Sequence, residues 1–448
     1  MKVLLIQPPL EDFYTTPIRL YPLGLLYAAR VLEEIGAEVG VLDCLTPLKK
    51  RKLPVPASFS YLPPLGEIPH FFKGYYRFGI GDEEILSRVE AFRPDLIGIS
   101  SQFTAYYQSV EELVRLIKRK SAVPVFLGGN HATVFAPEIR RRTPEIDGVL
   151  SGPAEECLPK FLNSLEPGIV DLEIDWQKIE PSHHLLRGKD YRIGKKNYIS
   201  LSASRGCPYG CEFCSVHRMF GKEIRYRDID SLLAEMRANY EKKGTQLFNF
   251  EDDNLSFDKK WFLEFLQAVA AEPRLQGIEL TAMNGLGYPT LDDEVLEAMK
   301  RAGFRELNLS LVSRDPELQK RYHRPYVIDG FDKFNRLIRA AKKLSFFITV
   351  YIIIGLPGQT HSEIKESIDY LLSLGVLVGP SVFYLSPGSR LYEKMDLPAA
   401  IKNDWNLYRS SAFAVETDEL SRGQLLSLFS YARAKNLENR QKKKTVES

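Results

Sequence analysis

The chain has 448 residues, of which 44% are apolar and 26% are charged, so its composition is that of a globular protein with two or three domains rather than a disordered or fibrous one. Its 60 Lys and Arg residues nearly balance its 58 Asp and Glu residues, and the net charge of +2 gives no reason to expect nucleic acid as a partner. No apolar run reaches the roughly 20 residues that span a bilayer and no secretory signal is recognisable, so we expect a cytoplasmic protein without a membrane partner.

Residues 1–160 alternate between short apolar runs and amphipathic helical segments. The runs that we predict as strands are VLLI, EVGVLD, DLIGIS, PVFLGG and DGVLSG, at residues 3–6, 38–43, 95–100, 124–129 and 147–152. Helical patterns lie between them, and the helix before the last strand is expected to begin near Pro137. Strands separated by helices pair in parallel through right-handed crossovers, so this region is predicted to form a doubly wound, Rossmann-like α/β sheet.

Ligands of doubly wound sheets bind at the carboxyl ends of the strands. In this chain those ends carry prolines and small or polar residues: Pro8, Pro9, Asp43, Ser100, Ser101, Gly128, Gly129, Asn130 and His131. Glycines at such ends let a ligand approach the backbone closely. We therefore predict a ligand crevice along this edge of the sheet.

Two segments interrupt the alternation. Residues 48–80 contain five prolines and many Phe and Tyr side chains, which is typical of a lid over a binding site or of an aromatic flap packed on the domain surface. Residues 161–197 lack a clear period and are predicted to be a linker over the surface. The linker contains His183 and His184, a pair that could ligate a metal but is more often solvated or hydrogen-bonded.

Alternation resumes at residue 198. Strand-like runs follow at residues 198–204, 246–250, 277–284, 306–312, 346–355 and 381–386. Six strands, each followed by a helix, predict an open (β/α)6 partial TIM barrel over residues 198–390, with its chemistry at the carboxyl ends of the strands. Residues 391–448 are predicted to be a helical region that ends in a frayed, charged tail.

The five cysteines are too few for a disulfide scaffold. Cys44 and Cys157 stand alone and are predicted to be core residues, whereas Cys207, Cys211 and Cys214 fall within eight residues of one another after the first barrel strand. Structural zinc sites and ferredoxin clusters usually use four ligands. Three thiolates on four irons would leave one iron open for a small chelating ligand, so the spacing favours an incomplete, reactive iron–sulfur site.

The motif Cys-x3-Cys-x2-Cys after the first strand of a partial barrel resembles that of the radical S-adenosylmethionine (SAM) superfamily. The resemblance implies a [4Fe–4S] cluster held by Cys207, Cys211 and Cys214, with an open iron that binds SAM. It also implies SAM contacts at these barrel positions: Phe213, Glu251, Asp252, Asp253, Asn284, Ser313, Arg324, Gly355 and Tyr384. Val312 stands where the family usually has Glu, and Gln359 replaces a Glu in the fifth-strand motif.

Several of these positions also have ordinary structural interpretations. Asp252 and Asp253 follow a strand, where acidic residues often cap the next helix. Ser313 could cap a helix that begins at Pro316, and Gly355 could serve only to shape a turn. The sequence alone leaves both interpretations open.

The N-terminal half resembles the cobalamin-binding domain that precedes the barrel in one branch of this superfamily. The similar segments are YPLGLLYAARVLEEIGAEVGVLD, PDLIGISSQ, VPVFLGGNHAT and DGVLSGPAEE. The resemblance implies cobalamin contacts at Pro22, Gly24, Ser100, Ser101, Gly128, Gly129, Asn130 and His131. Pro153 and Ala154 depart from the Gly-Glu-Gly-Glu typical of the branch, and Asp43 is not followed by the histidine that ligates cobalt in other cobalamin domains.

The two resemblances cover about residues 1–390 and imply the activity. They imply a cobalamin-dependent methyltransferase that acts through a 5′-deoxyadenosyl radical on an unactivated carbon of a small molecule or peptide. An external one-electron reductant of the flavodoxin or ferredoxin type would serve it. Two alternatives stay open: a radical SAM cyclase or rearrangement enzyme in which cobalamin transfers no methyl group, and a methylthiotransferase-like enzyme that modifies RNA or protein.

Overall fold

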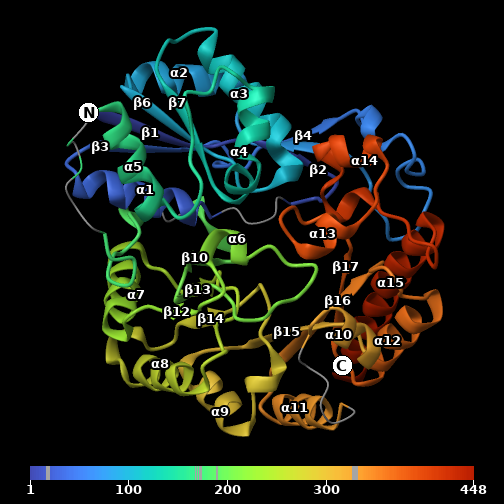
Figure 1. Cartoon of the computed structure of the whole chain (residues 1–448). Helices are drawn as coiled ribbons and strands as arrows, with labels where there is room; N and C mark the ends of the chain where they lie inside the picture. Colours follow the sequence, from blue (N-terminus) through green and yellow to red (C-terminus); the bar gives the residue numbers. More distant parts are fainter. Residues whose placement is uncertain are drawn as a thin grey trace.

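The computed structural model describes residues 1–16, 21–166, 168, 170, 174–187, 190–324 and 331–447, with side chains as far as residue 440. Two α/β units lie one above the other, and the C-terminal helices flank both of them on one side (Figure 1). Among the described residues, no helix has both the length and the apolar character that crossing a bilayer requires.

The N-terminal unit is the predicted doubly wound sheet. Its strands are parallel and lie in the order β3 (Glu38–Asp43), β1 (Lys2–Gln7), β6 (Leu96–Ser100), β7 (Val125–Gly128) and β8 (Gly148–Val149). The helices of this unit are α1 (Leu23–Glu34), α2 (Asp82–Phe92), α3 (Tyr107–Lys118), α4 (Asn130–Arg142) and α5 (Ala154–Leu165). The register pairs Gln7 with Asp43 and Ser100 with Gly128, so the strands end together at one edge.

The predicted start of a helix near Pro137 is wrong. Helix α4 begins seven residues earlier, at Asn130, directly after the left-handed Gly129. Pro137 lies inside this helix, and the backbone accommodates it through a kink at Phe135, where φ is −113°.

The aromatic segment 48–80 is the packed flap rather than a free lid. Two of its segments, β4 (Lys50–Leu53) and β5 (Tyr75–Phe78), form an antiparallel sheet with β2 (Leu10–Asp12). Between them, Phe71 and Phe72 pack against Phe413 and Phe429 of the C-terminal region, with ring centroids 5.5 to 6.5 Å apart. The flap therefore joins the N-terminal unit to the end of the chain.

The second unit is the predicted partial barrel. One group of parallel strands is β10 (Lys196–Leu201), β13 (Leu247–Phe250) and β14 (Glu279–Thr281), and the other is β15 (Glu306–Val312), β16 (Phe347–Ile354) and β17 (Leu377–Val382). Two isolated parallel bridges, Leu280–Phe304 and Leu286–Leu309, join the groups. The sixth strand was predicted at 381–386 but ends at Val382, because Phe383 and Leu385 leave the sheet to pack in the core beside the N-terminal helices.

Helices cover the outside of the barrel (Figure 1). They are α7 (Ile229–Lys243), α8 (Lys259–Ala271), α9 (Asp293–Ala302), α10 (Pro316–Arg321), α11 (Asp332–Lys343) and α12 (His361–Ser373). A short antiparallel strand, β9 (Arg192–Ile193), flanks β10 at one edge of the open barrel.

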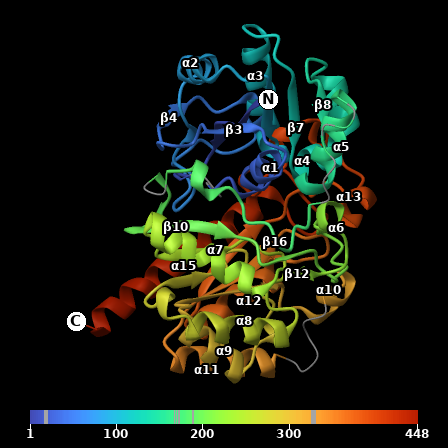
Figure 2. The ribbon, with the colours of Figure 1, turned by 90° about the vertical axis from the view of Figure 1, so that its left-hand side faces the viewer.

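The C-terminal region contains α13 (Arg390–Lys394), α14 (Ala399–Asn403) and the long α15 (Arg422–Glu447), whose end projects from the body of the molecule (Figure 2). The helix continues through the segment that was predicted to be a frayed tail, which is rich in Lys, Glu and Gln, all good helix formers. The Asn436 side chain of α15 accepts a hydrogen bond from the amide of Val378 on β17 at 3.0 Å and donates one to the Val378 carbonyl at 2.7 Å. Helix α15 thus covers the far edge of the barrel sheet.

The predicted linker, 161–197, does not lie wholly on the surface, although the structure describes it only in part. The side chains of Trp176 and His183 are buried. The two ring nitrogens of His183 contact Tyr21 and Glu235, at 2.5 and 2.8 Å. His183 is therefore a hydrogen-bonded core histidine and does not act as a metal ligand in this arrangement.

Candidate functional site

The three clustered cysteines lie on one loop between the first barrel strand and α7. Strand β11 (Ser204–Arg205) pairs with β12 (Arg225–Tyr226), and this hairpin encloses the loop and the short helix α6 (His217–Phe220). Gly206, at the start of the loop, has a φ of +86°, and a Cβ there would collide with the Glu223 carbonyl oxygen. Only glycine fits at this position, so the cysteine loop leaves the hairpin in one defined direction.

The three thiols are neighbours. The pKa of Cys214 is raised to about 12, mainly by burial and also by the nearby Cys211, Asp253 and Cys207. Among the described residues, no three His, Cys, Asp or Glu side chains are placed to hold a single metal ion. A cluster in which each thiolate binds a different iron does not require the sulfurs to converge on one ion.

The surroundings of the thiols suit an anionic sulfur cluster. The Asn254 amide donates to Cys207 Sγ at 3.6 Å, and the Arg324 guanidinium donates to Cys211 Sγ at 3.6 Å. Hydrogen bonds and positive charge at sulfur stabilise thiolates and iron-bound sulfur. The residues present therefore fit an iron–sulfur group. Arg324 was predicted as a SAM contact, and in this structure it donates to a cysteine sulfur instead.

The three acidic residues after β13 have different surroundings. Glu251 accepts hydrogen bonds from Ser200 at 3.1 Å and from Asn284 at 3.4 Å, so two predicted SAM contacts meet at the carboxyl ends of neighbouring strands. Asp252 instead turns into the protein, where it accepts from the Ser204 hydroxyl at 2.6 Å and from two backbone amides of the cysteine hairpin. Burial raises the pKa of Asp252 to about 7.

The helix-capping interpretation of these acids is wrong. The side chain that caps α8 is Asp258, which accepts from the Trp261 amide at 3.1 Å. Asp252 holds the hairpin before the cysteine loop, and Asp253 lies close enough to raise the pKa of Cys214. Asp252 and Asp253 thus face the cysteine segment rather than the next helix.

The end of β15 is irregular. Val312 has a φ of +76°, which is rare for a β-branched residue, and the strand register shifts beside it. The buried Gln319 amide donates to the carbonyl oxygens of Leu311 and Ser313 on either side of it. Arg324 also donates to this strand, at the Ser310 carbonyl, 2.9 Å away.

Ser313 does not cap the next helix either. Helix α10 is capped by Asp315, and the Ser313 hydroxyl donates to Glu363 on α12 at 2.7 Å. The hydroxyl also accepts from the Asp315 amide at 3.0 Å. The Ser313 hydroxyl, which was predicted to contact SAM, is thus hydrogen-bonded to Glu363 and to the Asp315 amide in this structure.

The turn after β16 is built around one glutamine. The Gln359 side-chain oxygen accepts from the amides of Gly355 and Leu356, both at 2.9 Å. Gly355 has a φ of +96°, and a Cβ there would lie 2.9 Å from Leu425, so the turn-shaping interpretation accounts for this glycine. Of the two remaining predicted contacts, Phe213 packs near Tyr322 with ring centroids 6.0 Å apart, and Tyr384 is largely exposed.

The strand ends of the N-terminal sheet enclose only a small cavity. It has a volume of about 40 Å³ at the ends of β1 and β6, and of the predicted crevice residues its lining contains Pro8, Pro9 and Ser100. At Gly129, where φ is +115°, a Cβ would lie 2.8 Å from the Ser101 carbonyl oxygen, whereas a Cβ on Gly128 would meet nothing. The Ser101 hydroxyl is buried and has no hydrogen-bond partner among the described residues.

An open glycine backbone and an unpartnered hydroxyl fit a polar, chain-like ligand group such as a nucleotide tail. Pro22 and Gly24 lie at the start of α1, and Gly24 has open space on its Cβ side. Asn130 is exposed at the start of α4.

The His131 side chain packs among aromatic rings at the contact with the C-terminal region. It is buried, with Nδ1 3.0 Å from the Thr104 hydroxyl, and its ring packs among Tyr107, Phe135 and Trp405. Burial and the nearby Arg142 charge lower the pKa of His131 to about 3. This ring serves the contact between the N-terminal unit and the C-terminal region.

The two sites face each other. Helix α4, which follows Gly128 and Gly129, contacts α6 of the cysteine loop, and the Thr133 hydroxyl lies 3.8 Å from Met219 Sδ. A ligand at the ends of the N-terminal strands would therefore lie near a group held by the cysteines. Sequence reasoning missed Asn254 and Glu363 because their partners, Cys207 and Ser313, lie 47 and 50 residues away along the chain. It also missed Gln319, whose partners Leu311 and Ser313 are close in sequence, because the bend of the strand that Gln319 bridges leaves no sequence motif.

Comparisons with known proteins agree with this geometry. A model of the Radical SAM superfamily matches residues 201–371, and a model of the B12 binding domain matches residues 72–162. The cytidylyl-2-hydroxyethylphosphonate methyltransferase of Streptomyces wedmorensis is 25% identical, over 91% of this chain and 84% of that protein. An uncharacterized methyltransferase of Pyrococcus horikoshii is 24% identical, over 88% of this chain and 83% of that protein.

A solved structure shares the fold. It is that of TsrM, a radical S-adenosylmethionine methyltransferase from Kitasatospora setae, with cobalamin and a [4Fe-4S] cluster bound. It matches 87% of this chain and 74% of that one with a TM-score of 0.63 at 19% identity. A second structure of TsrM contains its tryptophan substrate and a SAM analogue, and it matches with the same TM-score.

Proposed function

We propose that this chain, which belongs to the radical SAM superfamily and carries an N-terminal B12-binding domain, is a cobalamin-dependent methyltransferase acting on an unactivated carbon of a small molecule. The observation that carries the proposal is the contact between α4 and α6, which brings the crevice of one unit against the cysteine loop of the other. The methyltransferase from Streptomyces wedmorensis, similar over most of both chains, supports methyl transfer as the reaction.

We assign the cofactors to the residues that fit them. Cys207, Cys211 and Cys214 would hold a [4Fe–4S] cluster, and the crevice at Ser101 and Gly129 would hold cobalamin. When bound, the cluster and SAM supply one-electron and radical chemistry, and cobalamin supplies a transferable methyl group. The electron would come from an external reductant of the flavodoxin or ferredoxin type.

The chain's own residues prepare this site. Asn254 and Arg324 place donors on the cysteine sulfurs and favour their anionic form. Glu251 and Asn284 meet at the barrel mouth, where a carboxylate and an amide suit the amino group of SAM. Helix α4 packs on α6 above the loop, which limits the access of water to a site where a carbon radical would attack its neighbours.

The test is a labelling experiment on anaerobically purified, reconstituted protein. We expect iron, retained corrin and transfer of label from [methyl-13C]SAM to a compound in a small-molecule extract of the source cells. The variant Cys207→Ala/Cys211→Ala/Cys214→Ala should bind no cluster and transfer no label.

Three results would count against the proposal. A wild-type protein that retains no corrin and labels no product would overturn it. A new product without label would favour the cyclase or rearrangement alternative. Label in RNA or protein, together with sulfur insertion, would favour the methylthiotransferase alternative.

A further inference from the structure

Arg205 is a buried cation at the root of the cysteine loop. It is the last residue of β11 and lies two residues before Cys207. Its guanidinium donates to a carboxylate oxygen of Glu155, in the first turn of α5 of the N-terminal unit. Both side chains are almost completely buried, with exposed fractions of 6% and 3%. This buried ion pair therefore links the N-terminal unit to the segment that leads into the cysteines.

Aromatic rings enclose this guanidinium. It lies 4.5 Å from the ring centroid of Tyr27 on α1, 4.3 Å from that of Trp176 in the linker and 5.0 Å from that of Phe220 on α6. These rings come from the N-terminal unit, the linker and the cysteine segment respectively. Stacking on ring faces restricts the plane of an arginine head group, so the pair is directional as well as attractive.

The pair is poorly explained as a source of stability. Taking two charges out of water is expensive, and the attraction offsets that cost only when the remaining polar atoms are satisfied. Here the second oxygen of Glu155, the Tyr27 hydroxyl and the Trp176 indole N–H are buried without a hydrogen-bond partner among the described residues. Such an arrangement is better suited to fixing an orientation than to lowering the free energy of the folded state.

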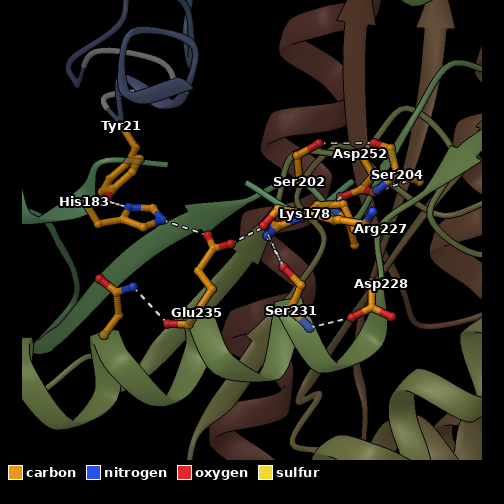
Figure 3. A network of polar contacts seen from close by, with 12 residues as sticks. Tyr21, Lys178, His183, Ser202, Ser204, Arg227, Asp228, Ser231, Glu235 and Asp252 are labelled. Atoms are coloured by element: carbon orange, nitrogen blue, oxygen red, sulfur yellow. Dashed lines mark hydrogen bonds and ion pairs between the residues drawn. The ribbon is translucent and has the colours of Figure 1, made fainter. Parts of the chain in front are cut away.

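A second polar network holds the other strand of the same hairpin (Figure 3). Arg227 donates to Glu235 at 2.5 Å, and both side chains are fully buried. Glu235 contacts His183 at 2.8 Å, and His183 contacts Tyr21 at 2.5 Å, next to the start of α1. The hairpin that encloses the cysteine loop is thus connected to the N-terminal unit both through β11, at Arg205, and through Arg227, the residue that follows β12.

We propose that Arg205 and Glu155 are positioning residues that fix the cysteine loop relative to the B12-binding crevice. The proposal rests on the proposed function, because the distance that they would set is the one between the cluster and cobalamin. Neither side chain would touch a reacting atom. Their effect would be on the spread of positions that the loop adopts.

The decisive variant is Glu155→Gln, which keeps the size of the side chain and removes its charge. The matched control is Glu156→Gln, on the next residue of the same helix turn. Glu156 also faces the hairpin, 3.9 Å from Arg225, but this pair is exposed. The two variants remove the same charge from adjacent residues and differ mainly in burial.

The first readout needs no cofactor. Hydrogen–deuterium exchange of residues 206–220 should be faster in Glu155→Gln than in wild type, while the barrel strands β10 and β13 exchange at the wild-type rate. A merely structural role would accelerate exchange in the loop and the strands together. Glu156→Gln should match wild type throughout.

The second readout uses the holoenzyme. Pulsed dipolar EPR between the reduced cluster and Co(II) cobalamin should give a distance distribution roughly twice as broad in Glu155→Gln as in wild type, since sites need positions held to about 0.5 Å. The amount of methylated product formed per SAM consumed should fall by up to about 100-fold, because misplacing a reacting group by about 1 Å can have that effect.

The outcomes separate the two proposals. Exchange and distance distributions in Glu155→Gln that equal those of Glu156→Gln would overturn the positioning role. If Glu155→Gln does not fold, Arg205→Lys, which keeps the charge but not the planar stacking, replaces it in both measurements. A wild-type enzyme that methylates nothing would refute the proposed function, while the exchange result would still decide the positioning role.

Discussion

Two of the regions where the N-terminal unit contacts the rest of the chain differ in chemistry; one lies near α1, α5 and α7 and the other near α14 and α15, on the other side of the molecule (Figure 1). The first, which we call the polar interface, consists of Tyr21, Tyr27, Glu155, His183, Arg205, Arg227 and Glu235. The second, the aromatic interface, consists of two groups of rings: Phe71, Phe72, Phe413 and Phe429 at the flap, and His131 with Trp405 at α4. The polar interface is built from charges and hydrogen bonds. The aromatic interface is built mainly from rings, although the buried ion pair of Asp12 and Arg409 also joins the N-terminal unit to the C-terminal region.

The difference in chemistry indicates that the aromatic interface mainly stabilises the fold and that the polar interface mainly fixes an orientation. Buried rings contribute stability in proportion to the area that they remove from water and tolerate small shifts. Buried ion pairs contribute little net stability but have strong directional preferences. The polar interface lies at the cysteine loop, where orientation matters, and the aromatic interface lies at the flap, where two distant parts of the chain need to stay together.

The largest expected effect is at the aromatic interface. Phe413→Ala should lower the free energy of unfolding by about 3–5 kcal/mol, because it removes a fully buried ring that contacts Phe71, Phe72 and Phe429. Chemical denaturation would measure the loss. Phe347→Ala, at a ring that is 47% exposed, is the matched control and should change the free energy by less than about 0.5 kcal/mol. If both variants lost the same free energy of unfolding, the rings of the aromatic interface would not contribute more stability than an exposed ring does.

The next effect is at the polar interface. Arg227→Met should lower the free energy of unfolding by about 3 kcal/mol, because it leaves Glu235 charged and buried beside His183 alone. The double variant Arg227→Met/Glu235→Leu should recover much of that loss but not the methyl-transfer activity. Denaturation and labelling assays on both variants would check this. A double variant that is fully active would show that the interface has no directional role.

A pH effect is expected from His131. Its pKa is about 3 in the folded protein against an ordinary 6.5, so the folded state excludes a proton that the unfolded chain binds. Stability is therefore complete above pH 6.5 and falls as the pH drops toward 3, by about 1.4 kcal/mol at roughly pH 5.5. His131→Gln should remove this part of the acid sensitivity in denaturation curves measured across that range, while His70→Gln, at an exposed histidine, should retain it.

The smallest effect is at the exposed edge of the polar interface. Arg225→Gln breaks an ion pair whose side chains are 41% and 55% exposed, so the free energy of unfolding should change by less than about 0.5 kcal/mol. Denaturation at low and high salt would test this. A loss as large as that of Arg227→Met would mean that burial does not distinguish the two pairs.

Local patterns were sufficient to predict both α/β units and to place the three clustered cysteines on one loop after the first barrel strand. Strand and helix periods are properties of neighbouring residues, and Cys207, Cys211 and Cys214 lie in one short segment. The boundaries were less accurate where tertiary packing decides them. Pro137 suggested a helix start, but Gly129 turns the chain into the helix seven residues before it.

The long-range contacts could not be predicted. Nothing in the acidic run distinguishes Asp252, which turns into the hairpin, from Glu251, which meets Asn284 at the barrel mouth. Glu155 and Arg205 are 50 residues apart, and each alone is an ordinary charged residue. Such pairs become visible only when the two units are placed against each other.

The contact between the Asn436 side chain of α15 and the backbone of β17 has a consequence for self-association. An open barrel leaves an edge strand whose backbone could pair with another chain, and closed barrels avoid this because they have no edge. The Asn436 side chain makes the two hydrogen bonds with Val378, one to its amide and one to its carbonyl, that a neighbouring strand would otherwise make. At Val378 this edge strand therefore offers no free backbone group for pairing, so we expect a chain that ends before residue 436 to be less soluble as well as less stable.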